Sequence, residues 1–320
     1  MVHLRRYFSL LCSISITAIA PVKQRSKHLL FNKLWAAILI IAALIFSSCV
    51  SHPSISPDDE LILYPQETYL PEEITWTPIS EKHDISYYRF ENPDFPLIYH
   101  IVKINLQDED LEITGYPSDP DTPKVYKSKR TQRFAAESDS LIAINASPFS
   151  GKSGKWDLIA KLGSTRQIVG VHTINGTQLS VPNQSYAALS FTKTSTGWNA
   201  KIIRSQTPQA LENAAFAFGG FYVILEHGVE QTFRAANHDS RTAAGISSNG
   251  DYLFILVVEG EKPSQSEGLS YQQCARILKK MGCSDALEFD GGGSTQLCIN
   301  GKSVLSYPNL RYQANSFGFK

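Results

Sequence analysis

The residues best suited to catalysis lie in one short stretch near the C-terminus. Residues 286–300 contain two acids, Glu288 and Asp290, that alternate with apolar residues. This alternation predicts a strand with one apolar face and one face that carries both carboxylates. The strand is followed by a run of small residues: Gly291, Gly292, Gly293 and Ser294. Because glycine allows positive φ and close approach to backbone N–H groups, we expect an anion-binding loop beside the acids.

Two kinds of chemistry fit the acid pair. On one strand face, the Cα atoms of Glu288 and Asp290 are about 7 Å apart. If both carboxylates are dehydrated, their repulsion raises the pKa of one and supplies an acid near neutral pH. In the alternative, their oxygens share a divalent cation. No other cofactor or metal site is expected.

Further polar residues stand near the ends of apolar runs. Asn145 and Glu259 each follow such a run, and Arg241 and Thr242 lie in a polar stretch between two of them. Each also has a plain structural explanation, as a turn former, a surface ion pair or a solvated strand end. Because a compact sheet brings strand ends together, these residues are the candidates that would complete a site around Asp290.

One helix is well marked and leads directly into the acidic strand. It begins at Ser270, which forms a capping box with Gln273, and it stops at Gly282. Its apolar residues recur at helical spacing, so one stripe packs on a sheet: Cys274, Ile277, Leu278 and Met281.

Most other segments have strand patterns. Residues 97–106 and 111–116 are predicted to form a hairpin, and Asn-Gly at 175–176 and Thr-Gly at 196–197 mark further hairpin turns. A second helix is expected over residues 131–137. The predicted fold class is α+β, a single β-rich domain with a mixed central sheet and few helices.

The first 48 residues differ from the rest of the chain. They hold six basic and no acidic residues and end in an apolar run of 13 residues, 34–46. A helix that spans a bilayer needs about 20 residues, so a signal peptide is expected. Residues 46–49, Phe-Ser-Ser-Cys, resemble a bacterial lipoprotein cleavage box in which Cys49 carries the lipid. The alternative is an uncleaved anchor.

Both interpretations place the domain outside the cytoplasm, in the periplasm or at the cell surface, held to the membrane at its N-terminus. The expected organisation is a signal peptide over residues 1–48, a lipid-anchored tether over 49–80 and a domain over 81–320. Without the six basic residues, 24 Lys and Arg oppose 30 Asp and Glu, a formal charge of −6. This balance argues against nucleic acid as a partner.

Cysteines and standard motifs narrow the function classes further. Cys274, Cys283 and Cys298 have no zinc-ligand spacing. A helix of nine residues separates the first two by about 13 Å, so buried free thiols are expected, with a disulfide between Cys283 and Cys298 as the alternative. The chain has no Gly-x-Ser-x-Gly elbow, His-Glu-x-x-His helix, P-loop or dinucleotide fingerprint, which argues against serine hydrolases, zincins and nucleotide-binding enzymes.

The order of these motifs resembles the phosphodiester glycosidase family, which includes the enzyme that uncovers mannose 6-phosphate by removing N-acetylglucosamine. The resemblance covers residues 96–320 and is strongest in the block 290–294, with further matches at 219–220 and 241–246. It implies a hydrolase that cleaves a glycosidic bond in a sugar-phosphate diester or an envelope glycan.

In such an enzyme, we expect Asp290 to act as nucleophile or base, with Glu259 or Glu288 as its partner. Arg241 and the N–H groups of residues 291–294 would hold the phosphate. The sugar would be oriented by two further residues: Asn145 and Thr242.

This chain departs from the family pattern at three places. Ala-Ser-Pro-Phe at 146–149 replaces the usual Gly-Gly-Phe-Phe, Glu259 replaces an Asp, and Glu288 replaces an Asn. Ser147-Pro148 and Glu288 support an alternative of a different class, a lipid-anchored carbohydrate-binding or envelope scaffold protein that retains the fold without turnover. A third interpretation is an enzyme that processes glycans at non-phosphate bonds.

Overall fold

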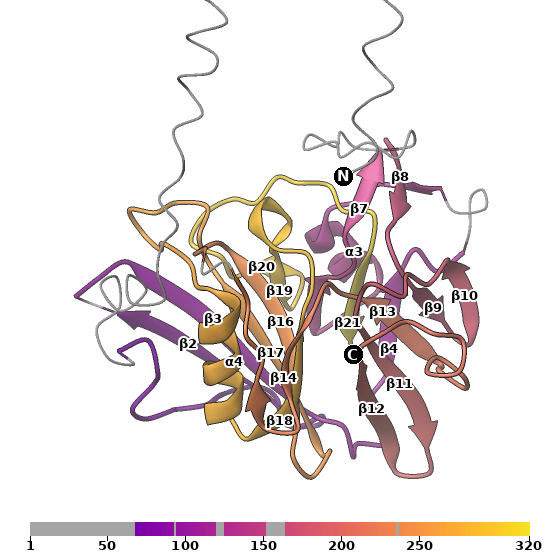
Figure 1. The fold of residues 1–320 in the computed structure, drawn as a ribbon, viewed down its shortest axis with the longest axis horizontal. Helices are drawn as coiled ribbons and strands as arrows, with labels where there is room; N and C mark the ends of the chain where they lie inside the picture. The colour runs from indigo at the N-terminus through magenta and orange to yellow at the C-terminus, as the bar shows by residue number, and fades with distance from the viewer. Residues whose placement is uncertain (1–67, 93, 120–124, 152–163, 235–236) are drawn as a thin grey trace, which may run out of the picture. The chain divides into compact units, whose positions relative to one another are not determined.

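The structure is a computed structural model that describes residues 68–92, 94–119, 125–151, 164–234 and 237–320 (Figure 1). The expected signal peptide, Cys49 and most of the expected tether lie outside these residues. The described chain folds as a single β-rich domain with two α-helices, α3 (Thr131–Glu137) and α4 (Tyr271–Lys280). The predicted fold class is therefore confirmed. None of the described helices is long and apolar enough to cross a membrane.

The largest sheet positions the acidic strand. Its eight strands follow the order β1 (Thr77–Ser80), β2 (Ile85–Asn92), β3 (Leu97–Asn105), β17 (Tyr252–Val258), β16 (Arg241–Ser247), β18 (Cys283–Glu288), β14 (Val223–Glu226) and β15 (Val229–Glu230). Each strand pairs antiparallel with its neighbours, although a mixed sheet was expected. Helix α4 does link two strands of the same direction, β17 and β18, but β16 lies between them and pairs with both.

Three smaller sheets complete the domain. One five-stranded sheet contains β10 (Thr177–Ser180), β9 (His172–Ile174), β13 (Phe216–Gly219), β11 (Ala188–Thr194) and β12 (Gly197–Ile203). The other contains β20 (Lys302–Ser303), β19 (Leu297–Ile299), β6 (Ile142–Asn145), β21 (Ser316–Phe319) and β4 (Ile113–Tyr116). A three-stranded sheet contains β5 (Tyr126–Lys127), β8 (Thr165–Ile168) and β7 (Phe149–Gly151).

The predicted hairpin over residues 97–116 is wrong. Strand β3 pairs with β2 and β17, whereas β4 joins β21 in another sheet. Trp198 separates the two segments, because its backbone N–H and its ring N–H donate to the carbonyls of Leu106 (2.7 Å) and Leu111 (2.7 Å). The two Gly-containing turns, by contrast, do connect paired strands as predicted, β9 with β10 and β11 with β12.

The two largest of four apolar clusters among the described residues lie on either side of the eight-stranded sheet's acidic strand. The larger one fills the space between the sheets and includes Leu287 and Phe289. The second lies between α4 and the eight-stranded sheet and includes Ala286 and Cys274. Strand β18 thus buries both of its faces, and all three described cysteines are free and buried, as expected. The packed part of the chain also extends before residue 81, the expected start of the domain, because Tyr69 is only 2% exposed.

The helix that precedes β18 has the predicted ends. The side chain of Ser270 accepts the backbone N–H of Gln273, and the Gln273 side chain accepts the N–H of Ser270, so the capping box is confirmed. Gly282 has a φ of +90°, a conformation that glycine adopts without strain. The helix is therefore fixed at both ends immediately before the strand that carries the acids.

Candidate active site

Strands β16 and β18 bring the predicted site residues to one end of the large sheet. Ala243 is opposite Glu288 in the register, and one step further the N–H of Phe289 donates to the carbonyl of Thr242 (2.8 Å). The N–H of Asp290 then donates to the carbonyl of Ala146 (3.0 Å), in the loop that follows β6. Two sheets therefore meet at Asp290, where β18 has ended.

Asn145 joins these segments through its amide group. Its Oδ1 accepts hydrogen bonds from the Thr242 hydroxyl (2.9 Å) and from the N–H of Gln296 (2.9 Å), and its Nδ2 donates to the carbonyl of Asp290 (2.6 Å). Both Asn145 and Thr242 are buried. The predicted grouping of Asn145, Thr242 and Asp290 is thus present, with the first two bonded behind the backbone of the third.

The three predicted carboxylates differ in their access to solvent. Glu259 and Glu288 are each 0% exposed, whereas Asp290 is partly exposed. The adjoining glycines, Gly291, Gly292 and Gly293, are partly exposed as well. Of the three acids, Asp290 is therefore the one that keeps some surface exposed to solvent.

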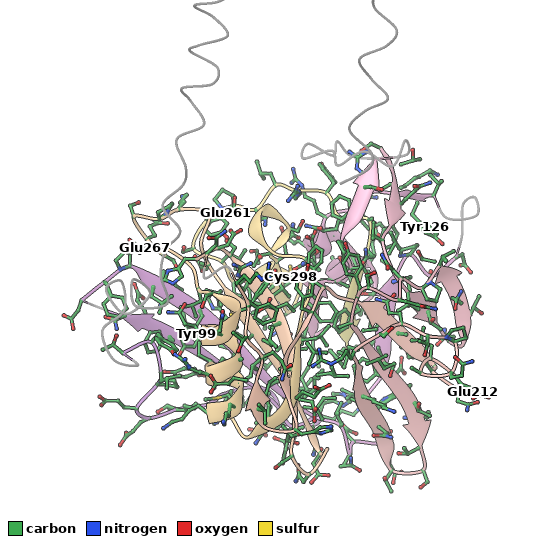
Figure 2. All side chains as sticks on the ribbon, viewed as in Figure 1. Tyr99, Tyr126, Glu212, Glu261, Glu267 and Cys298 are labelled. Carbon is green, nitrogen blue, oxygen red and sulfur yellow. The ribbon has the colours of Figure 1, made fainter. Side chains whose placement is uncertain are left out.

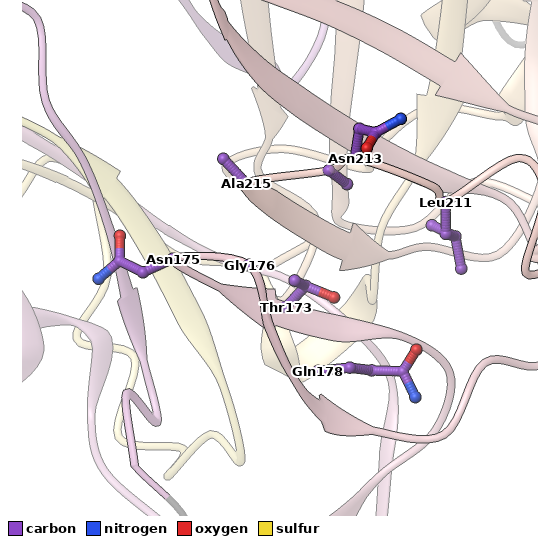
Figure 3. Close-up of a pocket in the computed structure, with 8 residues that line it drawn as sticks. Thr173, Asn175, Gly176, Gln178, Leu211, Asn213 and Ala215 are labelled. Carbon is purple, nitrogen blue, oxygen red and sulfur yellow. The ribbon is translucent and has the colours of Figure 1, made fainter.

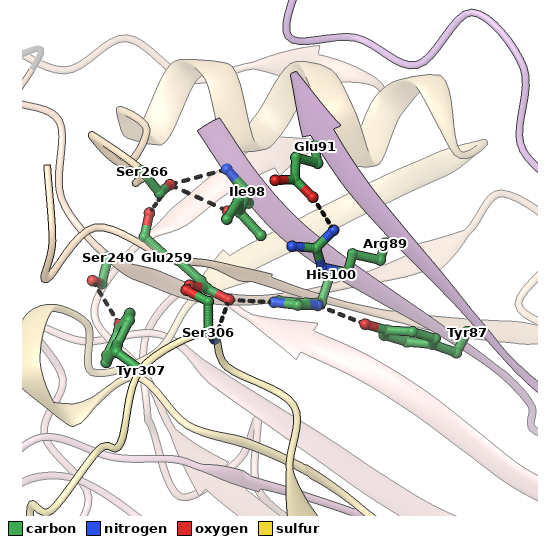
Figure 4. Close-up of polar contacts among 10 residues, drawn as sticks. All are labelled: Tyr87, Arg89, Glu91, Ile98, His100, Ser240, Glu259, Ser266, Ser306 and Tyr307. Atoms are coloured by element: carbon green, nitrogen blue, oxygen red, sulfur yellow. Dashed lines mark hydrogen bonds and ion pairs between the residues drawn. The ribbon is translucent and has the colours of Figure 1, made fainter. Parts of the chain in front are cut away.

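Glu259 lies in a buried hydrogen-bond network (Figure 4). Its Oε1 contacts His100 Nε2 (2.8 Å) and accepts the N–H of Ser306 (2.9 Å), while its Oε2 accepts the Ser306 hydroxyl. The other ring nitrogen of His100 contacts the hydroxyl of Tyr87 (2.7 Å). Burial raises the pKa of Glu259, but the bonds from His100 and Ser306 outweigh it, so the pKa is lowered and the carboxylate stays ionised.

Glu288 has a contrasting environment. Neither of its carboxylate oxygens has a hydrogen-bond partner. Burial raises its pKa to about 8, and the positive charge of Arg241 and the neighbouring thiol of Cys274 oppose that rise. The guanidinium of Arg241 donates to two backbone carbonyls and lies 4.3 Å from the ring centre of Tyr271. Glu288 is therefore fully buried beside an arginine, and its raised pKa favours the neutral acid at pH 7.

Asp290 has its own set of neighbours. Burial raises its pKa to about 6, the Ser294 hydroxyl, the Arg311 charge and the N–H of Gly291 lower it, and the charge of Asp239 raises it. Glu288 is not among these groups, so burial rather than the expected mutual repulsion accounts for both shifts. Within the described residues, no three His, Cys, Asp or Glu side chains are grouped as a metal site.

The glycine loop is more closed than the sequence predicts. Gly292, Gly293 and Ser294 form a 3-10 turn, in which the N–H of Ser294 donates to the carbonyl of Gly291 (3.1 Å). The N–H of Gly292 donates to the carbonyl of Ser240 (2.8 Å). These two N–H groups are therefore engaged within the protein. A Cβ atom at Gly291 would lie 2.8 Å from the same Ser240 oxygen, which explains the need for glycine there.

The structure adds a basic residue that the sequence patterns did not indicate. Arg311 donates from Nη1 to the hydroxyl of Ser294 (3.1 Å), and its Nε is buried without a hydrogen-bond partner. Arg311 and Glu261 both border Gly293, since a Cβ atom there would lie 3.2 Å from Arg311 Nη1 and 3.6 Å from Glu261 Oε2. Figure 2 labels Glu261. Arg311 follows an irregular segment with no motif, so no spacing in the sequence connects it to Asp290.

The fold is shared with several solved structures. A hypothetical protein from Synechocystis has a TM-score of 0.57 at 13% identity, over 78% of this chain and 64% of that one, so this chain spans less than two thirds of its length. The zebrafish N-acetylglucosamine-1-phosphodiester alpha-N-acetylglucosaminidase catalytic domain, auto-inhibited by its pro-peptide, has a TM-score of 0.54 at 18% identity, over 76% and 83%. A Burkholderia pseudomallei protein, whose name marks it as a candidate exported protein, has a TM-score of 0.52 at 12% identity, over 70% and 74%.

Sequence comparison gives a more specific result. The comparison with curated proteins found no match. The family model of phosphodiester glycosidases matches residues 138–320, which is more than half of the chain and includes the segments that meet at Asp290. The chain therefore belongs to the phosphodiester glycosidase family.

Proposed function

We propose that the chain hydrolyses glycosyl phosphodiesters and that Asp290 is its catalytic carboxylate. The observation that carries this proposal is the position of Asp290, which is partly exposed. Its backbone is fixed, because its carbonyl accepts from Asn145 Nδ2 (2.6 Å) and its N–H donates to the carbonyl of Ala146 (3.0 Å). A carboxylate whose backbone is held rigidly at a partly exposed position suits attack at a sugar C1 or activation of a water there. With a pKa of about 6, it is largely ionised at pH 7, as either role requires.

The balanced reaction uses one water. The bond between C1 and the phosphate oxygen breaks, the phosphate monoester leaves with the electron pair, and water adds to C1. Asp290 takes the water proton directly as a base, or acts first as a nucleophile and is then released by that water. Because a phosphate monoester is already a good leaving group, protonation of the leaving oxygen is not required.

Two arginines are candidates to hold the phosphate. Arg311 is partly exposed, donates to Ser294 in the glycine loop, and has a positive charge that lowers the pKa of Asp290. Arg241 was predicted to bind the phosphate, but its Nε and Nη2 donate to backbone carbonyls. We therefore propose Arg311 as a second phosphate-binding residue. A guanidinium at a partly exposed position is suited to phosphate oxygens.

The other predicted residues support the site in our proposal. Asn145 and Thr242 hold the backbone of Asp290, and Glu259 fixes the segment at Ser306 through its bonded carboxylate. Glu288, neutral at pH 7, serves as a buried acid beside Arg241. From the basic, apolar N-terminal segment and Cys49, we further infer that the enzyme is lipid-anchored outside the cytoplasm and acts on an envelope glycan or sugar phosphodiester.

The test is release of free sugar. The purified full-length chain is incubated with a panel of sugar 1-phosphodiesters that differ in the sugar, and the products are separated by chromatography. We expect free sugar and a phosphate monoester from at least one member, and a loss of about a thousandfold or more in rate for Asp290→Asn with an unchanged circular dichroism spectrum. Binding of a panel member without release would instead support the carbohydrate-binding scaffold, which the replacement of Asn by Glu288 favours.

A further inference from the structure

A cleft opens beside β14, away from the groups that surround the Asp290 carboxylate. Its volume is about 330 Å³, and three aromatic residues, Phe221, Tyr222 and Phe233, line it together with polar side chains that include Gln184, Arg204 and Gln231. Tyr222 is 44% exposed, which is unusual for a large ring in this domain. A concave site with aromatic walls and a few hydrogen-bonding groups has the general composition of a small-molecule site.

The aromatic rings that line the cleft contact one another, and Tyr186 packs behind them. The ring centres of Phe221 and Tyr222 are 6.0 Å apart, those of Tyr222 and Phe233 are 5.9 Å apart, and Tyr186 contacts Phe221 edge-on at 5.4 Å. The face of an aromatic ring is electron-rich, and the C–H groups on one face of a sugar ring carry partial positive charge. The wall therefore suits the apolar face of a sugar.

The polar side of the cleft is electrically balanced. Arg204 is the one charged residue among those that line it. Its guanidinium donates to both carboxylate oxygens of Glu226 (2.9 and 2.6 Å) and to Gln231 (2.8 Å). Because the positive charge is already paired, the cleft offers hydrogen bonds without an excess charge. This favours neutral hydroxyl groups over phosphate.

The cleft is connected to the strand that leads to Asp290. The N–H of Phe221 donates to the carbonyl of Glu288 (2.7 Å), and the N–H of Glu288 donates to the carbonyl of Tyr222 (2.9 Å). The Tyr222 ring also contacts the ring of Tyr271 (6.0 Å), over which Arg241 lies. From these contacts we propose that the cleft binds a neutral, non-reacting sugar unit of the substrate, which rests on the proposed function and names its substrate as a glycan of two or more sugars.

A second cleft differs from the first in its lining. It has a volume of about 390 Å³ and lies at the turns around Asn175 and Asn213, with Gln178 on its wall (Figure 3). No aromatic ring and no charged group line it. It therefore lacks the stacking surface and serves as a control site.

The experiment measures binding as a function of glycan length. Isothermal titration calorimetry compares the one-, two- and three-sugar members of three ladders: β-1,4-linked N-acetylglucosamine, β-1,4-linked glucose and α-1,4-linked glucose. The full-length chain is used as the Asp290→Asn variant, so that turnover does not interfere. We expect the two-sugar member of one ladder to bind about tenfold more tightly than its monosaccharide, the gain that one aromatic contact supplies.

Tyr222→Ala in the same background should remove this gain, and Gln178→Ala in the second cleft should keep it. The proposal is overturned if no ladder gains affinity with length, or if Tyr222→Ala keeps the gain. Displacement of the second sugar by inorganic phosphate would also overturn it. Because this readout needs no turnover, a length-dependent gain in a protein that releases no sugar would contradict the proposed function and still support sugar binding in the cleft.

Discussion

The amide of Asn145 donates to the carbonyl of Asp290 at 2.6 Å, across a sequence separation of 145 residues. This single contact ties the end of β6 to the end of β18. The same amide accepts bonds from Thr242 and Gln296, so one buried side chain fixes three segments around the proposed catalytic residue. Its role is positional, since its polar atoms are directed at the protein.

Asn145→Ala should therefore lower both stability and activity. It leaves the Thr242 hydroxyl, the Gln296 N–H and the Asp290 carbonyl without their partner in a buried site, which should cost about 2–3 kcal/mol in the free energy of unfolding. Urea unfolding measures this loss. Thr242→Val removes one of the three bonds and should cost about 1 kcal/mol. Equal losses in the two variants would contradict the proposed role.

The buried acid Glu288 should make stability depend on pH. Its pKa is raised from 4.5 to about 8, so the folded protein binds the proton more tightly than the unfolded chain does. The contribution of this group is fully present below pH 4.5 and is lost as pH rises toward 8. Glu288→Gln should thus stabilise the protein by about 3 kcal/mol at pH 7 and by little at pH 4.5.

Thermal unfolding across this pH range measures the difference between Glu288→Gln and the unmodified protein. Glu109→Gln, at an exposed acid, is the matched control and should leave the curve unchanged. If the stabilisation by Glu288→Gln is the same at pH 4.5 and pH 7, the carboxyl does not titrate as proposed.

Activity should rise with pH around the pKa of Asp290. Burial raises that pKa to about 6, and the ionised carboxylate is the active form. We expect kcat/KM to increase about tenfold per pH unit below pH 6 and to level off above it. Arg311→Gln removes a positive charge that lowers this pKa, so the rise should move to higher pH. An unchanged pH profile in this variant would show that Arg311 does not influence the pKa of Asp290.

The buried network of His100 and Glu259 should contribute to the stability of the fold rather than directly to catalysis. His100→Ala leaves the ionised Glu259 buried with one partner lost, which should cost about 3 kcal/mol in the free energy of unfolding. Tyr87→Phe removes only the outer bond of the network and should cost about 1 kcal/mol. Chemical unfolding of both variants checks the order. If folded Glu259→Gln loses as much kcat as Asp290→Asn, Glu259 is itself catalytic.

Local features of the structure could be predicted from the sequence, because their causes lie within a few residues. The capping box of Ser270, the glycine stop at Gly282 and the turn at residues 175–176 depend on nearest neighbours. The order of motifs also indicated that Asn145 and Thr242 lie close to Asp290.

Long-range features could not be predicted in this way. The insertion of β16 between β17 and β18 depends on pairing across the whole chain, and so does the separation of β3 from β4 by Trp198. Arg311 reaches the site region from a segment without a recognisable pattern. His100 lies in the predicted strand at residues 97–106, but its contact with Glu259 depends on the pairing of that strand with β17. The cause of the two carboxylate pKa shifts also required the structure, since each acid is surrounded by different groups.

The central claim is that Asp290 drives cleavage between C1 and the phosphate oxygen. The most direct measurement is turnover of a sugar 1-phosphodiester in water enriched in oxygen-18, with both products analysed by mass spectrometry. We predict that the label enters the sugar and not the phosphate monoester, and that Asp290→Asn abolishes this incorporation while the protein stays folded. Label in the phosphate, or equal incorporation by Asp290→Asn, would contradict the claim.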